Sequence, residues 1–381
     1  MCGIAGAISL INKKIYNIHN KLDRIYKSLN HRGPDQKGIY IAKNSNFFFI
    51  NTRLSIVGVN DKINIPLQSS NNKSVLTFNG EIYNYKNLKI EMERNKLNFY
   101  SNTDTEVPLN GLELQGKNFL EQIDGFWSFA FANISDNSFI ISRDLMGEKP
   151  LYYTIEDNIF YFASELNTIL ELIQKKPNFE ISSIIASFQN RSAPPGKTLL
   201  QNIKRLKGGE IIVIKPNEER KVIQHSFLSL KVSNWLNYFS KEPSLENIID
   251  TYNEELLKSC SGRIPQEVDF YTTLSGGIDS NLINSTISKN YNNKISAIHA
   301  HSQTNSPKKN RELSELESAQ YTAKKFKINL DQINLNDINS IDILEDSAKN
   351  SFDGVFCEGV ASFRQLARYS RLNDKKVLIL S

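Results

Sequence analysis

The chain has 381 residues and a formal net charge of +5; 40% of its residues are hydrophobic and 23% are charged. The length fits two domains with room for a third, and the composition is that of an ordinary globular protein. Because the lysines are spread along the sequence and no apolar run approaches the roughly 18 residues of a membrane span, we expect neither a nucleic-acid partner nor a membrane partner.

Residues 1 to about 165 are predicted to be rich in strands. The N-terminal stretch MCGIAGAISL is apolar but lacks a basic leader, so it favours a first strand over a secretory signal. One early helix is predicted from apolar residues at helical spacing, namely Ile18, Leu22, Ile25, Tyr26 and Leu29. Six further segments are predicted strands because they are short, β-branched or aromatic: Ile39–Ala42, Phe47–Ile50, Ser74–Phe78, Phe126–Ala132, Ser138–Ser142 and Ile159–Ala163. Many strands with few helices predict stacked antiparallel sheets.

The end of this first domain is predicted near residue 215. Ser192–Ile214 has the pattern of a proline-bearing turn followed by strands, which would close a domain spanning residues 1–215. Residues 216–245 are polar with little periodicity and are predicted to form a linker.

Strands and helices alternate in the predicted second domain, residues 246–381. Two helices are predicted by apolar stripes, the first at Ile248, Tyr252, Leu256 and Leu257, the second at Leu313, Leu316, Ala319, Ala323 and Phe326. A further helix is predicted from about Asn281. The predicted strands are Phe270–Leu274, Ile295–His299 and Val377–Leu380. This alternation is typical of a parallel sheet with helices on both faces.

The sequence contains three cysteines, Cys2, Cys260 and Cys357. An odd, sparse set gives neither a disulfide framework nor a paired metal spacing. A reducing compartment is the natural location for such a protein, so we predict the cytoplasm. Cys260 and Cys357 are interpreted as inert packing residues.

Cys2 lies between the initiator methionine and a glycine. Removal of Met1 would leave Cys2 with both a thiol and a free α-amine. An α-amine has an ordinary pKa of about 7.7–8.0, so it can accept the proton of the thiol near neutral pH and later protonate a leaving group. Position alone leaves a buried structural cysteine as an equal alternative.

Five short motifs then follow one another: MCGIAG at the N-terminus, HRGPD at His31–Asp35, RLSIV at Arg53–Val57, NGEIYN at Asn79–Asn84 and SNTDTEV at Ser101–Val107. Together they resemble the class II, N-terminal-nucleophile glutamine amidotransferases, and specifically the glutamine-hydrolysing asparagine synthetase family. SRDLMGEKPLYY at Ser142–Tyr153 and FASEL at Phe162–Leu166 are also similar to that family. The resemblance implies an α+β N-terminal-nucleophile glutaminase domain, with stacked antiparallel sheets flanked by helices.

The resemblance assigns catalysis to three residues. Cys2 would be the nucleophile, and the side-chain amide of Asn79 and the backbone N–H of Gly80 would stabilise the oxyanion. Losing one such donor typically costs about 2.7–4 kcal/mol of transition-state stabilisation.

Glutamine binding is assigned in the same way. Arg53 would bind the α-carboxylate, because a guanidinium is the natural bidentate partner of a carboxylate. Asp104 would receive the α-ammonium, and Glu81 belongs to the same pocket. The complete implied set is Arg53, Leu54, Ser55, Ile56, Val57, Asn79, Gly80, Glu81 and Asp104. His31 and Arg32 are interpreted as structural residues that order a loop over the site.

The motif SGGIDS at Ser275–Ser280 follows a predicted buried strand and opens a helix. Its glycines allow the backbone to wrap an anion, and a helix N-terminus offers unpaired N–H groups to phosphate. An ordinary strand–helix turn is the alternative. No GK[ST] follows, so this is not the phosphate loop of the P-loop ATPases.

SGGIDS resembles the pyrophosphate loop of the ATP pyrophosphatases, which implies an α/β parallel-sheet domain. Such enzymes convert a carboxylate to an acyl-adenylate and release pyrophosphate. The implied ATP-binding set is Leu274, Ser275, Gly276, Gly277, Asp279, Ser280, His299 and Ser381. Asp279 would help to hold Mg²⁺, because the charge of pyrophosphate must be neutralised.

The two halves imply one reaction, in which ammonia from glutamine attacks an adenylated carboxylate to give an amide and AMP. In the asparagine synthetases that carboxylate belongs to aspartate. The family continues past its VLSG-type strand into a second glycine-rich loop, whereas this chain stops at Ser381, so we expect a fragment or a truncated synthetase half. A homodimer is a further expectation.

His299 stands where the family usually has a small aliphatic residue. A metal site at His299 and His301 is one alternative, although no cysteine or acidic motif accompanies them. The difference also leaves open an acceptor other than aspartate, such as a sugar acid of a surface polysaccharide. A third alternative is a regulatory remnant with an inactive synthetase half.

Overall fold

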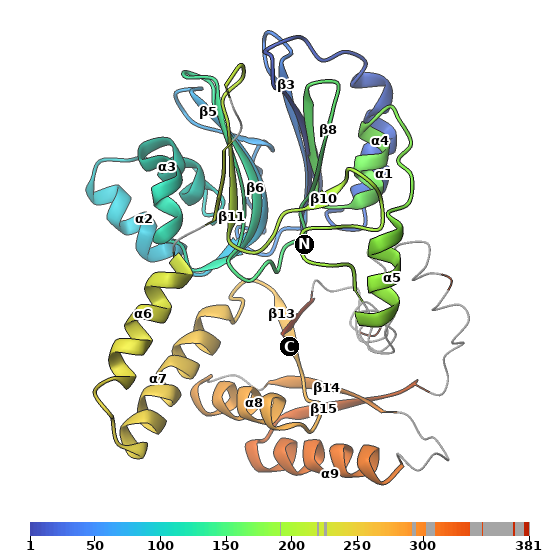
Figure 1. The fold of residues 1–381 in the computed structure, drawn as a ribbon. Helices are drawn as coiled ribbons and strands as arrows, with labels where there is room; N and C mark the ends of the chain where they lie inside the picture. The colour runs from blue at the N-terminus through green and yellow to red at the C-terminus, as the bar shows by residue number, and fades with distance from the viewer. Residues whose placement is uncertain are drawn as a thin grey trace. The chain divides into compact units, whose positions relative to one another are not determined.

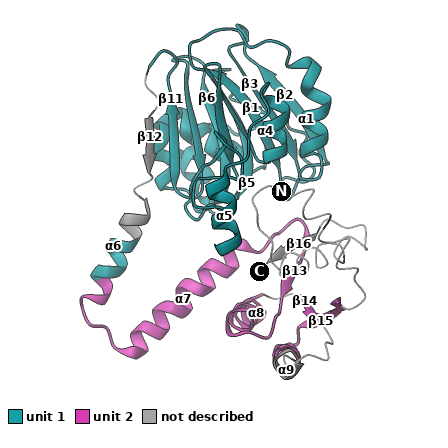
Figure 2. Ribbon diagram, turned by 45° about the vertical axis from the view of Figure 1, so that its right-hand side comes forward, with its two compact units in different colours: residues 1–237, 351–355 teal, residues 238–350, 356–381 magenta. Residues whose placement is uncertain are grey.

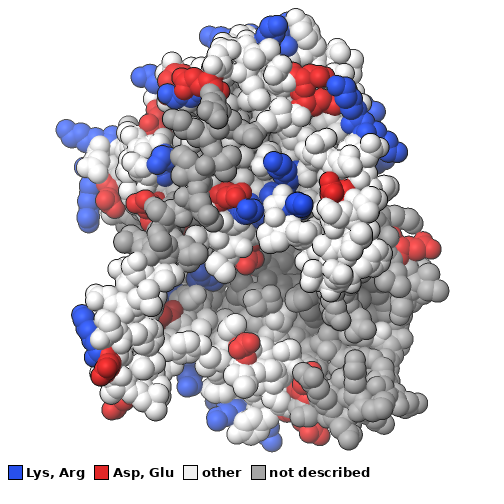
Figure 3. Space-filling view, viewed as in Figure 1, with Lys and Arg blue, Asp and Glu red and all other residues white. Residues whose placement is uncertain are grey.

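A computed structural model describes residues 1–190, 192–218, 221–224, 227–291, 295–301, 309–335, 345, 369 and 377–380. The chain divides into two compact units, residues 1–237 with 351–355 and residues 238–350 with 356–381 (Figure 2). None of the helices in the described part of the chain is long and apolar enough to cross a membrane. On the face drawn in Figure 3, basic and acidic side chains are interspersed and neither kind forms a continuous patch.

The first unit contains two six-stranded antiparallel sheets. The first sheet has the order β10 (Lys204–Arg205), β8 (Tyr152–Glu156), β9 (Ile159–Ala163), β1 (Gly3–Ser9), β3 (Phe47–Arg53) and β2 (Gln36–Ile41). The second has the order β12 (Lys221–Gln224), β11 (Glu210–Ile214), β7 (Ser138–Arg143), β6 (Gly125–Asn133), β5 (Ser74–Ile82) and β4 (Leu67–Gln68). The predicted stacked antiparallel sheets are therefore confirmed.

Strand alternation explains why these sheets stack. Ile4 and Phe49 of the first sheet share one core with Val75 of the second, whereas their neighbours Ala5 and Phe48 belong to a separate core. Successive side chains point to opposite faces of a strand, so each sheet buries both faces. Helices cover the outer faces, α1 and α4 on the first sheet and α2 and α3 on the second (Figure 1).

The sequence predicted only one helix in this unit, and that prediction was incomplete. The helices in the structure are α1 (Leu22–Leu29), α2 (Tyr85–Arg94), α3 (Glu106–Gln115), α4 (Leu166–Leu172) and α5 (Ile181–Asn190). Six of the ten residues of α3 are buried, so its sequence shows no amphipathic stripe. In contrast, α1 has the predicted stripe, with Ile25 and Leu29 buried.

The predicted linker, residues 216–245, contains regular structure. It holds β12, which pairs with β11, and α6 (Phe227–Phe239). An edge strand forms its backbone hydrogen bonds with one neighbour and needs no strong apolar pattern, so β12 was not predicted from the sequence. The boundary between the two units falls near the end of α6.

The second unit is built on a four-stranded parallel sheet, as predicted for an α/β domain, in the order β15, β14, β13 and β16. Its strands are β13 (Asp269–Thr273), β14 (Ser296–His301), β15 (Asn329–Asn334) and β16 (Val377–Leu380), and its helices are α7 (Leu245–Arg263), α8 (Ile278–Asn290) and α9 (Lys309–Phe326). Strand β15 was not predicted, and α8 begins three residues before the predicted Asn281. Leu274, Ile287 and Ala319 form part of the core between sheet and helices.

We expect Gly6→Ala to lower the free energy of unfolding of the first unit by about 1–3 kcal/mol. A Cβ on Gly6 would lie 2.5 Å from Cζ of Phe162 and 2.6 Å from the carbonyl oxygen of Phe48. The Phe48 oxygen belongs to the backbone of a paired strand, so it cannot move away without disturbing the sheet. Denaturation followed by the fluorescence of buried Trp127 measures this. The control Gly262→Ala, where no atom lies within 4 Å, should be neutral or stabilising. Equal stability of Gly6→Ala and wild type would contradict the close packing of β1.

Candidate functional site

Cys2 lies directly before β1, at the end of a central strand of the first sheet. Its thiol is half-buried and faces the carbonyl oxygen of Leu54, with 3.8 Å between Sγ and the oxygen. Nε of Arg32 donates to the carbonyl oxygen of Cys2 at 3.0 Å. The backbone of Cys2 is therefore fixed by a buried guanidinium while its thiol remains accessible.

The buried Arg32 is itself held by the half-buried Glu165, with which it forms an ion pair. Burial would raise the pKa of Glu165, but hydrogen bonds from His31 and Arg32, with the charge of Arg32, hold it below its usual value. The same loop fixes the next segment, because Asp35 accepts a 2.7 Å hydrogen bond from the backbone N–H of Ser55. His31 and Arg32 thus order the site, and Asp35 has a similar role that the sequence analysis missed.

The two sheets are joined beside Cys2 by the buried side chain of Asn51. Its amide Nδ2 donates to the carbonyl oxygen of Gly3 at 3.0 Å and to that of Phe78, on the other sheet, at 3.4 Å. Cys2 and Asn79 are the chain neighbours of these two acceptors. The structure therefore brings the predicted nucleophile and the predicted oxyanion residue to the same place.

Asn79 is completely buried and has an amide atom without a partner. Nδ2 lies 3.3 Å from Oγ of Ser128, whereas Oδ1 has no hydrogen-bond partner. The two ends of an amide are assigned by their surroundings, and the reverse assignment pairs Oδ1 with the hydroxyl and frees Nδ2. In either assignment one strongly polar atom is buried unsatisfied, which favours a ligand as its partner.

Gly80 pairs with Trp127 across β5 and β6. A Cβ at this position would lie 2.3 Å from the carbonyl oxygen of Phe126 and 2.8 Å from Cα of Trp127, so only glycine fits. Glycine therefore keeps β5 in close register at the residue whose N–H is predicted to face the oxyanion.

Two carboxyl groups lie at the end of this strand, the partly buried Glu81 within β5 and the buried Asp104, which bonds Ile82. Burial raises the pKa of Asp104 to about 6, although its Oδ2 accepts a 2.8 Å hydrogen bond from the backbone N–H of Ile82. Burial and the charge of Asp104 raise the pKa of Glu81 to about 7. A ligand ammonium would favour both carboxylates, so their chemistry fits the predicted role in binding an α-ammonium.

Arg53 is buried, and each of its terminal nitrogens makes two hydrogen bonds to the protein. Nη1 donates to Oε1 of Gln36 at 2.9 Å and to the carbonyl oxygen of Asp61 at 3.1 Å, and Nη2 donates to the carbonyl oxygens of Val57 and Gly58 at 3.0 Å each. Arg53 thus fixes the end of the predicted segment Leu54, Ser55, Ile56 and Val57. Its role as the ligand of a substrate carboxylate remains a prediction. In that role, at least one of these hydrogen bonds would have to break.

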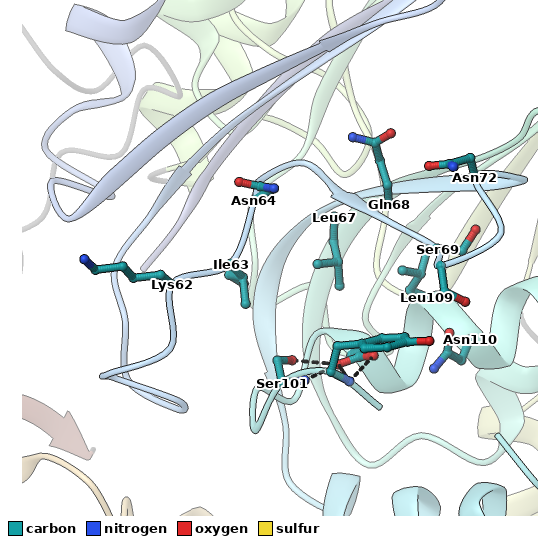
Figure 4. A pocket seen from close by; sticks show the side chains of 13 residues that line it. Lys62, Ile63, Asn64, Leu67, Gln68, Ser69, Asn72, Ser101, Leu109 and Asn110 are labelled. Carbon is teal, nitrogen blue, oxygen red and sulfur yellow. Dashed lines mark hydrogen bonds between the residues drawn. The ribbon is translucent and has the colours of Figure 1, made fainter. Parts of the chain in front are cut away.

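A cavity of about 390 Å³ is lined by residues from the segments 62–72 and 100–110 (Figure 4). On its floor, the buried carboxylate of Glu106 accepts hydrogen bonds of 2.9 Å from the backbone N–H groups of Tyr100 and Ser101 and of 2.7 Å from the Ser101 hydroxyl. The backbone N–H of Asn102 donates to Oδ2 of Asp61 at 2.6 Å. Glu106, a residue the sequence analysis missed, therefore stiffens the segment that carries Asp104.

In the second unit, the predicted anion loop has an open helix terminus. The helix α8 begins after Gly277, its N-cap residue, and no side chain caps this terminus. Asp279 is exposed in the first turn of the helix. Gly276 has φ of 85°, and a Cβ there would lie 1.9 Å from the carbonyl oxygen of Glu315. Uncapped N–H groups at a helix N-terminus can bind an anion. The roles of this loop in ATP binding and of Asp279 in holding Mg²⁺ remain predictions.

The hydroxyls of Ser275 and Ser280 lie 2.9 Å apart across the loop. Leu274 is buried, and its carbonyl oxygen accepts a 2.7 Å hydrogen bond from Nδ1 of His299. Burial lowers the pKa of His299. Ser381 lies outside the described residues, as does Cys357. The described residues hold no group of three or more His, Cys, Asp or Glu side chains that could bind a metal ion.

Two family models match the chain, the glutamine amidotransferase domain over residues 1–227 and asparagine synthase over residues 251–367. Putative asparagine synthetase (glutamine-hydrolyzing) 2 of Methanocaldococcus jannaschii is 27% identical, over 74% of this chain and 56% of that protein. Asparagine synthetase (glutamine-hydrolyzing) 2 of Bacillus subtilis is 30% identical, over 74% of this chain and 38% of its own. The chain spans about half the length of such relatives.

Amidase chry2 of Gibberella zeae is also similar, with 25% identity over 76% of this chain and 43% of that protein. Among solved structures, glutamine phosphoribosylpyrophosphate amidotransferase from B. subtilis matches with a TM-score of 0.43 and 16% identity, covering 87% of this chain and 65% of the other.

We expect Asp104→Asn to stabilise the protein at pH 8. The pKa of this carboxyl is raised in the folded state, so folding holds its proton and stability falls as the pH rises from about 4 to about 6. An asparagine can still accept from Ile82 and avoids the buried charge, which is worth up to about 3 kcal/mol above that window. Denaturant unfolding at pH 4 and pH 8 measures the gain. It should vanish at pH 4, and the exposed control Glu93→Gln should show none; a gain that is equal at both pH values would contradict a buried charge at Asp104.

Proposed function

Because the chain belongs to the glutamine amidotransferase family, in the group of the asparagine synthetases, we propose that it hydrolyses glutamine with Cys2 and transfers the ammonia to an adenylated carboxylate. The observation that carries the first half of this proposal is the buried amide of Asn79, one atom of which has no partner and which Asn51 links to Gly3, the chain neighbour of Cys2. An oxyanion site requires a donor, and Nδ2 supplies one in the assignment that pairs Oδ1 with the Ser128 hydroxyl.

The first half-reaction begins after Met1 is removed. The α-amine of Cys2 takes the proton of the thiol, and the thiolate attacks the carboxamide carbon of glutamine. Asn79 and the N–H of Gly80 then stabilise the oxyanion. The C–N bond breaks, the amine returns the proton to the departing ammonia, and water hydrolyses the glutamyl thioester to glutamate.

Substrate selection depends on the two charged ends of glutamine. Asp104 and Glu81 would bind the α-ammonium, and Arg53 would bind the α-carboxylate. Binding the ammonium replaces a repulsion between two buried carboxylates with two attractions. An amide without an α-amino group leaves that repulsion in place and should bind weakly.

The second half-reaction is proposed for the other unit. The loop Ser275–Ser280 and the N-terminus of α8 would hold the phosphates of ATP, with Leu274 and His299 near the nucleoside. Asp279 would contribute to a Mg²⁺ site, and the metal would neutralise the pyrophosphate leaving group. We propose aspartate as the acceptor, because the relatives named above include asparagine synthetases.

A different carboxylate acceptor is the second candidate. The buried imidazole of His299, hydrogen-bonded to the carbonyl oxygen of Leu274, differs from the aliphatic residue expected there by resemblance. Identification of the amide product with aspartate or a sugar acid supplied as acceptor distinguishes the two candidates. A cytoplasmic location and a homodimer remain proposals; both described cysteines, Cys2 and Cys260, are free thiols.

We expect Cys2→Ala to abolish glutamate formation from glutamine, because the variant lacks the thiol that is proposed to attack the carboxamide carbon. Intact-mass measurement should first show that Met1 is absent from the wild-type protein. Glutamate release, and AMP formation with aspartate and either glutamine or ammonium, are then compared. Cys2→Ala should lose only the glutamine-dependent part, and the control Cys260→Ala should retain glutamate release. Equal loss of the glutamine- and ammonium-dependent reactions would contradict two separate sites.

A further inference from the structure

Ser128 lies directly opposite Asn79 on the neighbouring strand. The two residues pair across β5 and β6, and Oγ of Ser128 lies 3.3 Å from the side-chain amide of Asn79. Both side chains are fully buried. Directly paired residues of an antiparallel sheet place their side chains on the same face, so this contact follows from the register of the two strands.

The shared face looks toward the other sheet of the first unit, which carries the proposed nucleophile. Val75 and Ala130 lie on the same face by strand alternation, and both belong to the core between the two sheets. The hydroxyl of Thr77 donates to a backbone carbonyl oxygen of the other sheet. Ser128 and Asn79 therefore point into the space between the sheets.

The hydrogen bonds of this pair differ between the two assignments of the amide. Among the described residues, the Asn79 amide is the only hydrogen-bond partner of the Ser128 hydroxyl. With Nδ2 toward the hydroxyl, the hydroxyl only accepts, so its own proton and Oδ1 of Asn79 are both buried without a partner. With Oδ1 toward the hydroxyl, the hydroxyl donates and Nδ2 alone is left unsatisfied. Buried polar groups without partners are costly, so the second assignment is favoured.

We propose that Ser128 is a positioning residue of the glutaminase site, whose hydroxyl donates to Oδ1 of Asn79 and so keeps Nδ2 free to donate to the oxyanion. This inference rests on the proposed hydrolysis of glutamine at Cys2. Ser128 makes no bond to the substrate and acts only through the amide of Asn79.

An orienting partner matters because an asparagine side chain does not by itself decide which end of its amide faces a ligand. Its terminal torsion is broad and roughly two-fold. With Oδ1 toward the developing negative charge, Asn79 would repel the oxyanion instead of stabilising it. A bond that holds Oδ1 elsewhere therefore acts mainly on the transition state, whereas the binding of glutamine in the ground state depends on other groups.

Ser128→Ala should lower kcat for glutamate release by about tenfold with little change in KM, as measured by steady-state kinetics with glutamine. Complete loss of one oxyanion donor typically lowers kcat by about 10²–10³-fold, and Ser128→Ala leaves the donor present but without its orienting partner. Ser128→Thr keeps a hydroxyl and should retain most of the wild-type kcat.

The matched control is Ser74→Ala. Ser74 is a fully buried serine on the same strand as Asn79, and its hydroxyl donates to Glu113. Its replacement removes a buried hydroxyl and a hydrogen bond at a position five residues before Asn79, so it should leave kcat unchanged.

A double-mutant cycle separates a positioning role from a merely structural one. Asn79→Ala should lower kcat more than Ser128→Ala does. In the Asn79→Ala background, Ser128→Ala should have almost no further effect, because the amide that it orients is gone. A wild-type kcat in Ser128→Ala, a raised KM with unchanged kcat, or effects of the two substitutions that multiply would each overturn the inference.

Those outcomes would leave glutamate release by the wild-type protein, and with it the proposed function, intact. Absence of glutamate release from the wild-type protein would instead remove the proposed function. Melting curves confirm that the variants fold. Ser128→Cys replaces Ser128→Ala if the latter does not fold; a thiol is only a weak donor, so a fall in kcat is required of it as well.

Discussion

The site depends on one constraint, the register between the two sheets of the first unit. Two buried side chains set it: Asn51 reaches across to the carbonyl oxygen of Phe78, and Thr77 reaches back to that of Ile50 at 2.9 Å. Sheets packed only through apolar side chains can slide with little loss, whereas buried hydrogen bonds are costly to break. These bonds therefore hold the N-terminal cysteine against the Asn79–Gly80 segment, although the two lie on different sheets.

Ionised carboxyl groups beside these two sheets lower the free energy of unfolding of the first unit, because burial disfavours their charged forms. Burial raises the pKa of both Glu81 and Asp104, and the charge of Asp104 adds to the rise at Glu81, while Arg32 and Arg53 hold backbone segments. In the proposed function, the ammonium of the substrate would favour the ionised form of both groups, so its binding would offset the cost of their burial.

The second unit uses simpler means. A parallel sheet aligns the ends of β13 and β14, and the loop that follows β13 turns at Gly276 against the carbonyl oxygen of Glu315 before α8 begins. The anion binding proposed there would need only the backbone N–H groups at a helix N-terminus. It would therefore depend on the backbone conformation of the loop, not on charged side chains. His299 is the exception, because its side chain bonds the last residue before the loop.

The sequence by itself determined most strands of the two units, the position of Cys2 and the glycine-rich turn, because these depend on local periodicity, chain position and backbone freedom. It did not reveal β15, or α3, whose buried residues surround the helix, or β12, an edge strand paired by its backbone. Nor did it reveal that Glu106 stiffens the Asp104 segment, since that role depends on neighbours brought close by folding. Local patterns carry the identity of elements and motifs; only the tertiary structure decided which polar atoms are buried together, and burial is what changes their chemistry.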